Sequence, residues 1–227
     1  MTPSPSVLLF DVNETLSDMA PMAGRFADVG APTSLAATWF ASLLRDGFAL
    51  TVTGENPAFA QVARGVLGSQ LTEHVGRGEL DDAVEHVLSG FGQLDVHPDV
   101  VDGVRALGAA GVRLVTLSNG SADVARGLLD RAGVLDCFER LLSVEQAPRW
   151  KPAPEAYAYA LEVCGVPASE AMLVAVHPWD LHGARAAGVA TAWIDRAGGR
   201  YPDHMAAPDV TATGLGDLAR QLGAGGA

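Results

Sequence analysis

The sequence predicts an α/β protein: a Rossmann-like parallel sheet flanked by helices, with a helical cap domain inserted after the first strand. The second half of the chain alternates short apolar runs, typical of strands buried on both faces, with helical patterns. Residues 18–95 instead show successive helical stripes and no convincing strand pairing. We therefore predict a core domain of residues 1–17 and 96–227 and a cap domain of residues 18–95.

The predicted strands of the core are apolar runs separated by helical patterns. They are residues 7–10, 112–117, 141–144, 172–176 and 189–194. Val100, Val104 and Leu107 form one helical stripe between two of these runs, and Gly111 follows it in a position that suits a left-handed helix end. Gly165 and Gly188 close two further helices in the same way, while Pro154 lies near the start of its helix, where a missing N–H costs little.

Three amphipathic stripes predict the helices of the cap. They are Leu35/Trp39/Leu43, Phe59/Val62/Ala63/Val66 and Leu80/Val84/Val87/Leu88. Glycine and proline residues predict the breaks between them, at Gly47, Gly54, Pro57, Gly76 and Gly78. Because active sites of parallel sheets lie at the carboxyl ends of the strands, a block inserted after the first strand is expected to cover that edge.

Composition restricts the classes of partner and the compartment. A net charge of −12, from 15 Lys and Arg against 27 Asp and Glu, disfavours nucleic acid and anionic membrane surfaces as partners. No apolar run approaches the roughly 20 residues that span a bilayer, and no basic flank precedes the first run, so we expect a cytoplasmic protein. Cys137 and Cys164 lack CxxC spacing and are interpreted as free thiols rather than a disulfide or metal site.

Polar clusters directly follow four of the predicted strands. They are Asp11, Ser118-Asn119-Gly120, Arg149-Trp150-Lys151-Pro152 and His177-Pro178-Trp179-Asp180. A single aspartate in a loop is usually a cap or turn residue, but four clusters in register should meet at one sheet edge. We therefore interpret Asp11 as the nucleophile of a hydrolytic site.

The order of these clusters resembles the haloacid dehalogenase superfamily. Its motifs are an Asp-x-x-x-Thr after the first strand, a Ser or Thr after the next, a Lys before a Pro and an acidic loop. These match Asp11 to Thr15, Ser118, Lys151 and Asp180.

Two departures select a branch of that superfamily. Phosphatases of this kind carry a general acid two positions after the nucleophile, where this chain has Asn13, and two acids in the fourth motif that hold Mg²⁺, where it has only Asp180. The chain looks like the metal-independent 2-haloacid dehalogenases, which implies no metal, no cofactor and a small halogenated carboxylic acid as substrate. Short (S)-2-haloalkanoic acids would become 2-hydroxy acids through an ester of Asp11. The alternatives are a Mg²⁺-dependent phosphatase, a hydrolase of another strained or activated C–X bond, and a non-catalytic binding protein.

The resemblance implies a role for each site residue. The catalytic set is Asp11, Thr15, Lys151 and Asp180, in which Lys151 keeps Asp11 ionised and Asp180 orients Lys151 and the hydrolytic water. The substrate-binding set is Ser118, Asn119, Trp39, Tyr157, His177 and Trp179. Thr15 and Ser118 would donate hydrogen bonds to the carboxylate of Asp11 or of the substrate. Asn119 would donate to the departing halide, with a structural turn residue as the alternative. Trp39, Tyr157 and Trp179 would exclude water, although Trp39 also suits plain packing in the cap. His177 would support attack by water or line the pocket, with a structural histidine as the alternative, and Trp150 and Trp193 are interpreted as core.

One feature of the related dehalogenases is missing. They carry an arginine in the first cap helix, a few residues before a tryptophan, where this chain has Ser34-Leu35-Ala36-Ala37-Thr38-Trp39. Arg25 or Arg45 would replace it only with a different cap geometry, and the loss of a guanidinium donor leaves the leaving group open, with fluoride or a strained ring amine as candidates. Related enzymes are often homodimers, and the resemblance extends that expectation to this chain.

Overall fold

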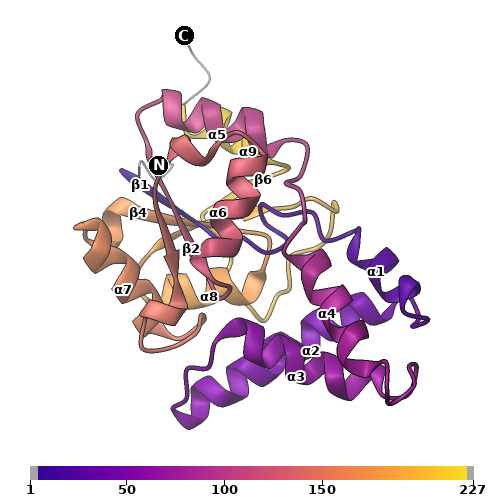
Figure 1. Ribbon diagram of the computed structural model, residues 1–227. Helices are drawn as coiled ribbons and strands as arrows, with labels where there is room; N and C mark the ends of the chain where they lie inside the picture. Colours follow the sequence, from indigo (N-terminus) through magenta and orange to yellow (C-terminus); the bar gives the residue numbers. More distant parts are fainter. Residues whose placement is uncertain (1–4, 224–227) are drawn as a thin grey trace.

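The computed structural model describes residues 5–223 and has the predicted α/β architecture (Figure 1). Its six-stranded sheet has the order β3-β2-β1-β4-β5-β6, and every pairing is parallel. The strands are β1 (Val7–Phe10), β2 (Arg113–Ser118), β3 (Phe138–Ser143), β4 (Ala171–Ala175), β5 (Ala190–Ile194) and β6 (Val210–Ala212). The third strand begins earlier than predicted, and β6 was missed because three residues carry no measurable alternation.

Helices cover both faces of the sheet, and the side chains of β1 show why. Leu8 and Phe10 pack in one cluster with α5 (Val100–Ala109), α6 (Ala122–Arg131) and α9 (Leu215–Gln221). Val7 and Leu9 belong to the cluster that contains α7 (Pro154–Cys164) and α8 (Pro178–Ala186). Since successive side chains of a strand point to opposite faces, a fully apolar β1 requires this double cover. Short 3-10 helices complete the core at Leu135–Cys137, Val144–Gln146 and Ala168–Glu170.

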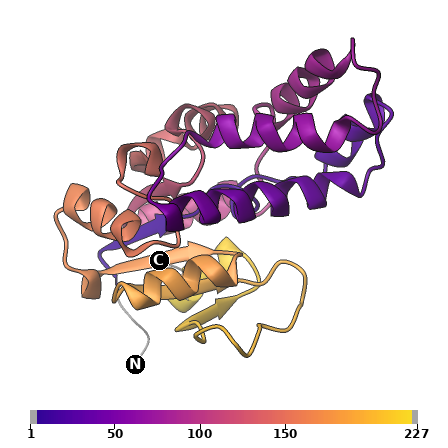
Figure 2. The ribbon, with the colours of Figure 1, turned by 90° about the horizontal axis from the view of Figure 1, so that it is seen from below.

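Four helices lie in sequence between β1 and α5, at the lower right of Figure 1. They are α1 (Met22–Asp28), which the sequence stripes did not reveal, α2 (Leu35–Thr53), α3 (Phe59–Leu71) and α4 (Leu80–Phe91). Figure 2 shows α2 and α3 running side by side, and the two helices are in contact. Ser17 forms an isolated antiparallel bridge with Val96 where the chain leaves and rejoins the core, which supports the domain boundaries that we propose at 17/18 and 95/96.

Gly47 corrects one prediction about the cap. It does not break a helix, because α2 runs through it and ends only at Gly54, whose φ of 96° is left-handed. A Cβ atom at Gly47 would lie 2.3 Å from Cζ3 of Trp150. The missing side chain therefore lets the buried Trp150 ring pack directly against the backbone of α2.

Two other sequence expectations concern thiols and membranes. Cys137 and Cys164 are both free thiols, as predicted, but only Cys164 is buried, whereas the sequence predicted burial of both. Within residues 5–223, no helix combines the length and the apolar character that crossing a bilayer demands.

Candidate active site

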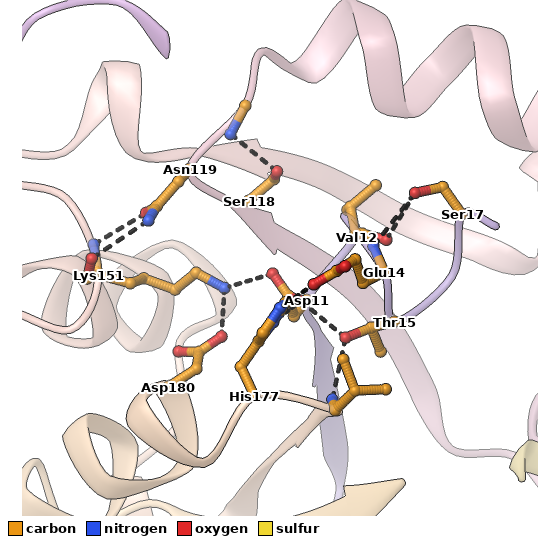
Figure 3. Close-up of polar contacts among 12 residues, drawn as sticks. Asp11, Val12, Glu14, Thr15, Ser17, Ser118, Asn119, Lys151, His177 and Asp180 are labelled. Atoms are coloured by element: carbon orange, nitrogen blue, oxygen red, sulfur yellow. Dashed lines mark hydrogen bonds and ion pairs between the residues drawn. The ribbon is translucent and has the colours of Figure 1, made fainter. Parts of the chain in front are cut away.

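The carboxyl ends of the central strands bring together the residues that the sequence motifs singled out. Asp11 follows β1, and Asp180 lies in the first turn of α8 just beyond β4, the neighbour of β1 in the sheet. Lys151 reaches the same point from the loop before α7 (Figure 3). Parallel register thus places residues separated by more than 100 positions in the sequence within hydrogen-bond distance.

Lys151 lies between two buried carboxylates. Its Nζ is 2.9 Å from Oδ1 of Asp11 and 2.5 Å from Oδ2 of Asp180, and neither the ammonium nor Asp180 is exposed to solvent. It is also the only lysine in the sequence. Because a buried charge is tolerated only when it is paired, this ammonium and the two carboxylates stabilise one another.

The pKa values of the three groups follow from this arrangement. Burial alone would raise the pKa of Asp11, but the charges and hydrogen bonds of Lys151 and His177 hold it well below its usual range. Burial would lower the pKa of Lys151, but its two carboxylate partners raise it. The pKa of Asp180 is raised, first by burial and then by the nearby charge of Asp11, with Lys151 opposing both. Lys151 and His177 therefore keep Asp11 ionised despite its burial.

Thr15 fixes the second oxygen of the Asp11 carboxylate. Its hydroxyl donates to Oδ2 of Asp11 at 2.7 Å and accepts from the backbone N–H of Val176 at 3.1 Å. The hydroxyl thereby ties the loop after β1 to the end of β4, which orients the carboxylate.

His177 binds the same oxygen and a residue that the sequence patterns did not single out. Its Nδ1 lies 3.1 Å from Oδ2 of Asp11, and its Nε2 lies 2.8 Å from Oε2 of Glu14. Burial would lower the pKa of His177, but the two carboxylates raise it to about 9. Glu14 has a φ of 62°, which is unusual for a residue other than glycine, and no sequence pattern signals that conformation.

Asn119 and Tyr157 are in the site but hold protein groups. The amide of Asn119 accepts from the backbone N–H of Lys151 at 2.9 Å and donates to its carbonyl at 3.2 Å. The Tyr157 hydroxyl donates to Oδ1 of Asp180 at 2.7 Å, and burial followed by the charge of Asp180 raises its pKa well above the usual value. Both contacts position the catalytic candidates, and the expected contacts of Asn119 and Tyr157 with substrate stay predictions.

The remaining substrate-binding candidates lie in different surroundings. The Ser118 hydroxyl accepts from the backbone N–H of Gly120 at 2.9 Å. Trp179 packs against His177, with ring centroids 5.1 Å apart, and is half-buried. Trp39 lies instead inside the cap, fully buried, with its indole N–H donating to the carbonyl of Ala63 at 3.2 Å. The alternative of plain packing therefore describes its surroundings.

A cleft of about 490 Å³ adjoins this cluster. Glu14, Val176 and Arg196 line it from the core. Met22, Ala36 and Phe40 are among the residues that line it from the helices inserted after β1. Phe40, one residue after Trp39, also packs against His177 with ring centroids 6.3 Å apart. Glu14, which is bound to His177, therefore connects this cleft to the cluster around Asp11.

Neither arginine suggested by the sequence lines this cleft. Arg25 donates to Oε1 of Gln93, and Arg45 is paired with its neighbour Asp46 at the surface. The arginine that does line the cleft is Arg196, which is bound to Asp99 at 2.5 Å and to the carbonyl of Thr15 at 2.8 Å. Arg196 lies in the loop after β5 and belongs to none of the polar clusters that the sequence analysis identified.

A parallel sheet with a buried aspartate after its first strand, a lysine bound to that aspartate and helices inserted before the second strand defines a hydrolase of the haloacid dehalogenase type. The family model for the haloacid dehalogenase-like hydrolases matches residues 6–188, and the chain belongs to that family.

The chain is also similar to several dehalogenases. (S)-2-haloacid dehalogenase 1 of Pseudomonas sp. (strain CBS-3) is 30% identical over 83% of this chain and 83% of its own length. Haloacetate dehalogenase H-2 of Moraxella sp. (strain B) is 37% identical, but the match covers 52% of this chain and 53% of the relative. A dehalogenase solved as an intermediate complex is 25% identical, with a TM-score of 0.89 over 97% of this chain and 98% of its own.

Proposed function

We propose that this protein is a hydrolytic dehalogenase that converts short 2-haloalkanoic acids to 2-hydroxy acids without a metal ion. The observation that carries the proposal is the Asp11 carboxylate, buried yet ionised, with Lys151 bound to one oxygen and Thr15 and His177 bound to the other. A carboxylate freed from water and held in one orientation is a competent nucleophile toward carbon. The function of the relatives described above supports the same chemistry.

The proposed reaction has two displacements. In the first, an oxygen of Asp11 attacks the carbon that bears the halogen, a C–O bond forms, and the C–X bond breaks with both electrons leaving on the halide. In the second, water attacks the carboxyl carbon of the Asp11 ester, and the bond to the alkoxide oxygen breaks. The products are the 2-hydroxy acid, the restored carboxylate and one proton.

A halide leaves without a proton, whereas the alkoxide of a phosphate ester usually needs one. The residue two positions after the nucleophile is Asn13, whose side chain has no proton to transfer and is 6% exposed. The absence of an acid at this position therefore favours a C–X substrate over a phosphate ester.

The residues of the site also do not fit the Mg²⁺ on which related phosphatases depend. Magnesium requires several oxygen ligands in near-octahedral order. The oxygens of Asp11 already accept from Lys151, Thr15 and His177, and those of Asp180 accept from Lys151 and Tyr157. Among residues 5–223, no three His, Cys, Asp or Glu side chains are grouped so as to hold a metal ion.

A panel of halide-release assays tests the proposal. Fluoro-, chloro- and bromoacetate and both enantiomers of 2-chloropropionate are incubated with the protein in the presence of a chelator. We expect halide release from at least one acid, with the (S)-enantiomer preferred as in the relatives, and none from Asp11→Asn. Release of phosphate from an aryl phosphate only when Mg²⁺ is added would favour the phosphatase instead.

A second measurement tests the ester. A single turnover in ¹⁸O-labelled water should place the label in the peptide that contains Asp11, because water attacks the carboxyl carbon rather than the substrate. Label found only in the product acid would show direct displacement by water and would contradict the ester mechanism.

The leaving group, the oligomeric state and the cellular location of the enzyme are predictions. The missing cap arginine leaves His177 and Arg196 as the cationic groups nearest the cleft, so fluoride or a strained ring amine stays a candidate leaving group. A homodimer is expected from related enzymes and would be checked by sedimentation. A cytoplasmic location would be checked by fractionation of the source cells.

A further inference from the structure

His177 lies between the carboxylates of Asp11 and Glu14, and this placement determines its protonation state in the free protein. Nδ1 is 3.1 Å from Oδ2 of Asp11 and Nε2 is 2.8 Å from Oε2 of Glu14. A carboxylate can only accept a hydrogen bond, so both ring nitrogens carry protons and the ring is an imidazolium. Its side chain is 12% exposed.

Glu14 is itself held in place by backbone contacts. Its N–H donates to Oγ of Ser17 at 3.3 Å, and its carbonyl accepts from Nε2 of His97 at 2.9 Å. The left-handed backbone at Glu14, a conformation that costs free energy for a residue other than glycine, accompanies this anchored arrangement beside His177.

We propose that His177, oriented by Glu14, is the general base of the second displacement, and that formation of the Asp11 ester converts it from a cation to that base. This inference rests on the proposed dehalogenase function and adds the residue that activates the hydrolytic water. His177 is a catalytic residue in this scheme because it contacts the reacting carboxyl group, and Glu14 is a positioning residue.

The switch follows from the charge that the first displacement removes. An ester is neutral, so the charge of Asp11 that raises the pKa of His177 is lost, while burial still lowers it. The charged groups that remain are Glu14 against the ring, and Lys151 with Asp180 on the far side of Asp11. His97 and Arg196 line the cleft beside Glu14.

The tautomer that results has the geometry of a base. The Nε2 proton stays on the hydrogen bond to Glu14, so Nδ1 carries the lone pair and faces the Asp11 ester. The imidazole of His177 contacts the rings of Trp179 and Phe40, and these two rings restrict water around it.

Protons and bonds balance in the second displacement. Nδ1 takes one proton from water as the O–C bond to the Asp11 carboxyl carbon forms. The same nitrogen returns that proton to the alkoxide as the ester C–O bond breaks. The Asp11 carboxylic acid then ionises, and its proton restores the imidazolium at His177, so one turnover still releases a single proton.

An NMR titration tests the switch without any substrate. The ¹⁵N imidazole signals are followed with pH in the wild type and in Asp11→Asn, whose neutral amide stands for the ester, and His177 is assigned by the loss of its signal in His177→Asn. We expect its pKa to fall by at least about one pH unit in Asp11→Asn, because one unit corresponds to about 1.4 kcal/mol of lost interaction with the carboxylate. An unchanged titration in Asp11→Asn would overturn the proposal.

Rapid-quench kinetics with bromoacetate or (S)-2-chloropropionate test the base itself. His177→Asn should release one equivalent of halide in a burst and accumulate a protein whose mass is raised by the bound acid, with ester hydrolysis slowed about 100-fold or more. His86→Asn is the matched control, because His86 is paired with Asp28 at 3.0 Å in the cap, and it should turn over like the wild type. Hydrolysis of the ester by His177→Asn at the wild-type rate would refute the base role.

The variant Glu14→Gln distinguishes a role of Glu14 in orienting His177 from a general loss of folded protein. Loss of this carboxylate should lower the pKa of His177, so the rise of ester hydrolysis with pH should begin at lower pH than in the wild type, while the halide burst persists. An unshifted pH profile would overturn the role of Glu14. Absence of halide release from the wild type would instead refute the dehalogenase function, and the titration would still decide whether the charge switch exists.

Discussion

Replacing Lys151 with methionine should destabilise the protein more than the loss of any surface ion pair. Methionine keeps much of the apolar stem but removes the ammonium that lies 2.9 Å from Asp11 and 2.5 Å from Asp180. Asp180, whose side chain is unexposed, would then have no counterion, and Asp11, with a 5% exposed side chain, would keep only His177. Removing one partner of a buried ion pair typically costs about 3–5 kcal/mol, a large part of the roughly 5–15 kcal/mol that stabilises a domain.

The cost should depend on pH, and the sign follows from the carboxylates. The pKa of Asp11 in the wild type is lowered, so its stabilisation is present above the unfolded value of about 4 and is lost as the pH falls through the folded value. In Lys151→Met, burial raises the pKa of both carboxylates, so the folded state is penalised increasingly as the pH rises above about 4. The difference between the two proteins should therefore be smaller at pH 4.5 than at pH 7.5.

Urea unfolding followed by circular dichroism at those two pH values measures the effect. The matched control is Arg64→Met, which removes an equally short pair with Glu85 whose side chains are 53% and 65% exposed. That pair should contribute about 1 kcal/mol or less. A cost below about 1 kcal/mol for Lys151→Met at pH 7.5, or one that does not change with pH, would refute the argument that the buried ammonium compensates the two carboxylates.

Three further outcomes are expected. Gly47→Ala should lower the free energy of unfolding by about 1–3 kcal/mol, because its Cβ would lie 2.3 Å from the Trp150 ring, whereas Gly65→Ala, with no atom within 4 Å, should be neutral or stabilising in the same urea assay. The free energy of unfolding of the wild type should fall by up to about 3 kcal/mol as the pH rises from about 6.5 through about 9, because protonated His177, whose pKa is raised to about 9, stabilises the folded state. Thermal unfolding of His177→Asn should show a smaller dependence on pH over the same range. Reductive methylation should leave the unexposed Lys151 unmodified in the native protein and modify it in urea, and peptide mass spectrometry that finds rapid native labelling would contradict its burial.

The sequence by itself determined the fold class and the central residues of the site. A four-residue apolar run before Asp11, and the polar clusters that follow later runs, depend only on burial and on the shared edge of a parallel sheet. Both are local sequence patterns, and together they place the polar clusters at one edge of the sheet. They were sufficient to predict that Asp11, Lys151 and Asp180 would meet.

Only the tertiary structure decided how the other candidates are used. Gly47 has the same sequence signature whether it breaks a helix or admits a ring, and Trp150 from the core makes it the second. Asn119 and Tyr157 were expected to contact substrate, and the structure adds protein partners, Lys151 and Asp180, which lie 32 and 23 residues away along the chain. A side chain's partners across elements depend on packing, which no local pattern encodes.

The pairing of Glu14 with His177 shows the same limit at the point where it matters most for chemistry. Each residue occupies an ordinary loop position, and the two are 163 residues apart in the sequence. The left-handed backbone at Glu14 and the parallel alignment of β1 with β4 bring them together beside Asp11. The sequence singled out Asp11 as the candidate nucleophile, and the fold decided which groups set its charge, because electrostatic interactions act through distance in space rather than along the chain.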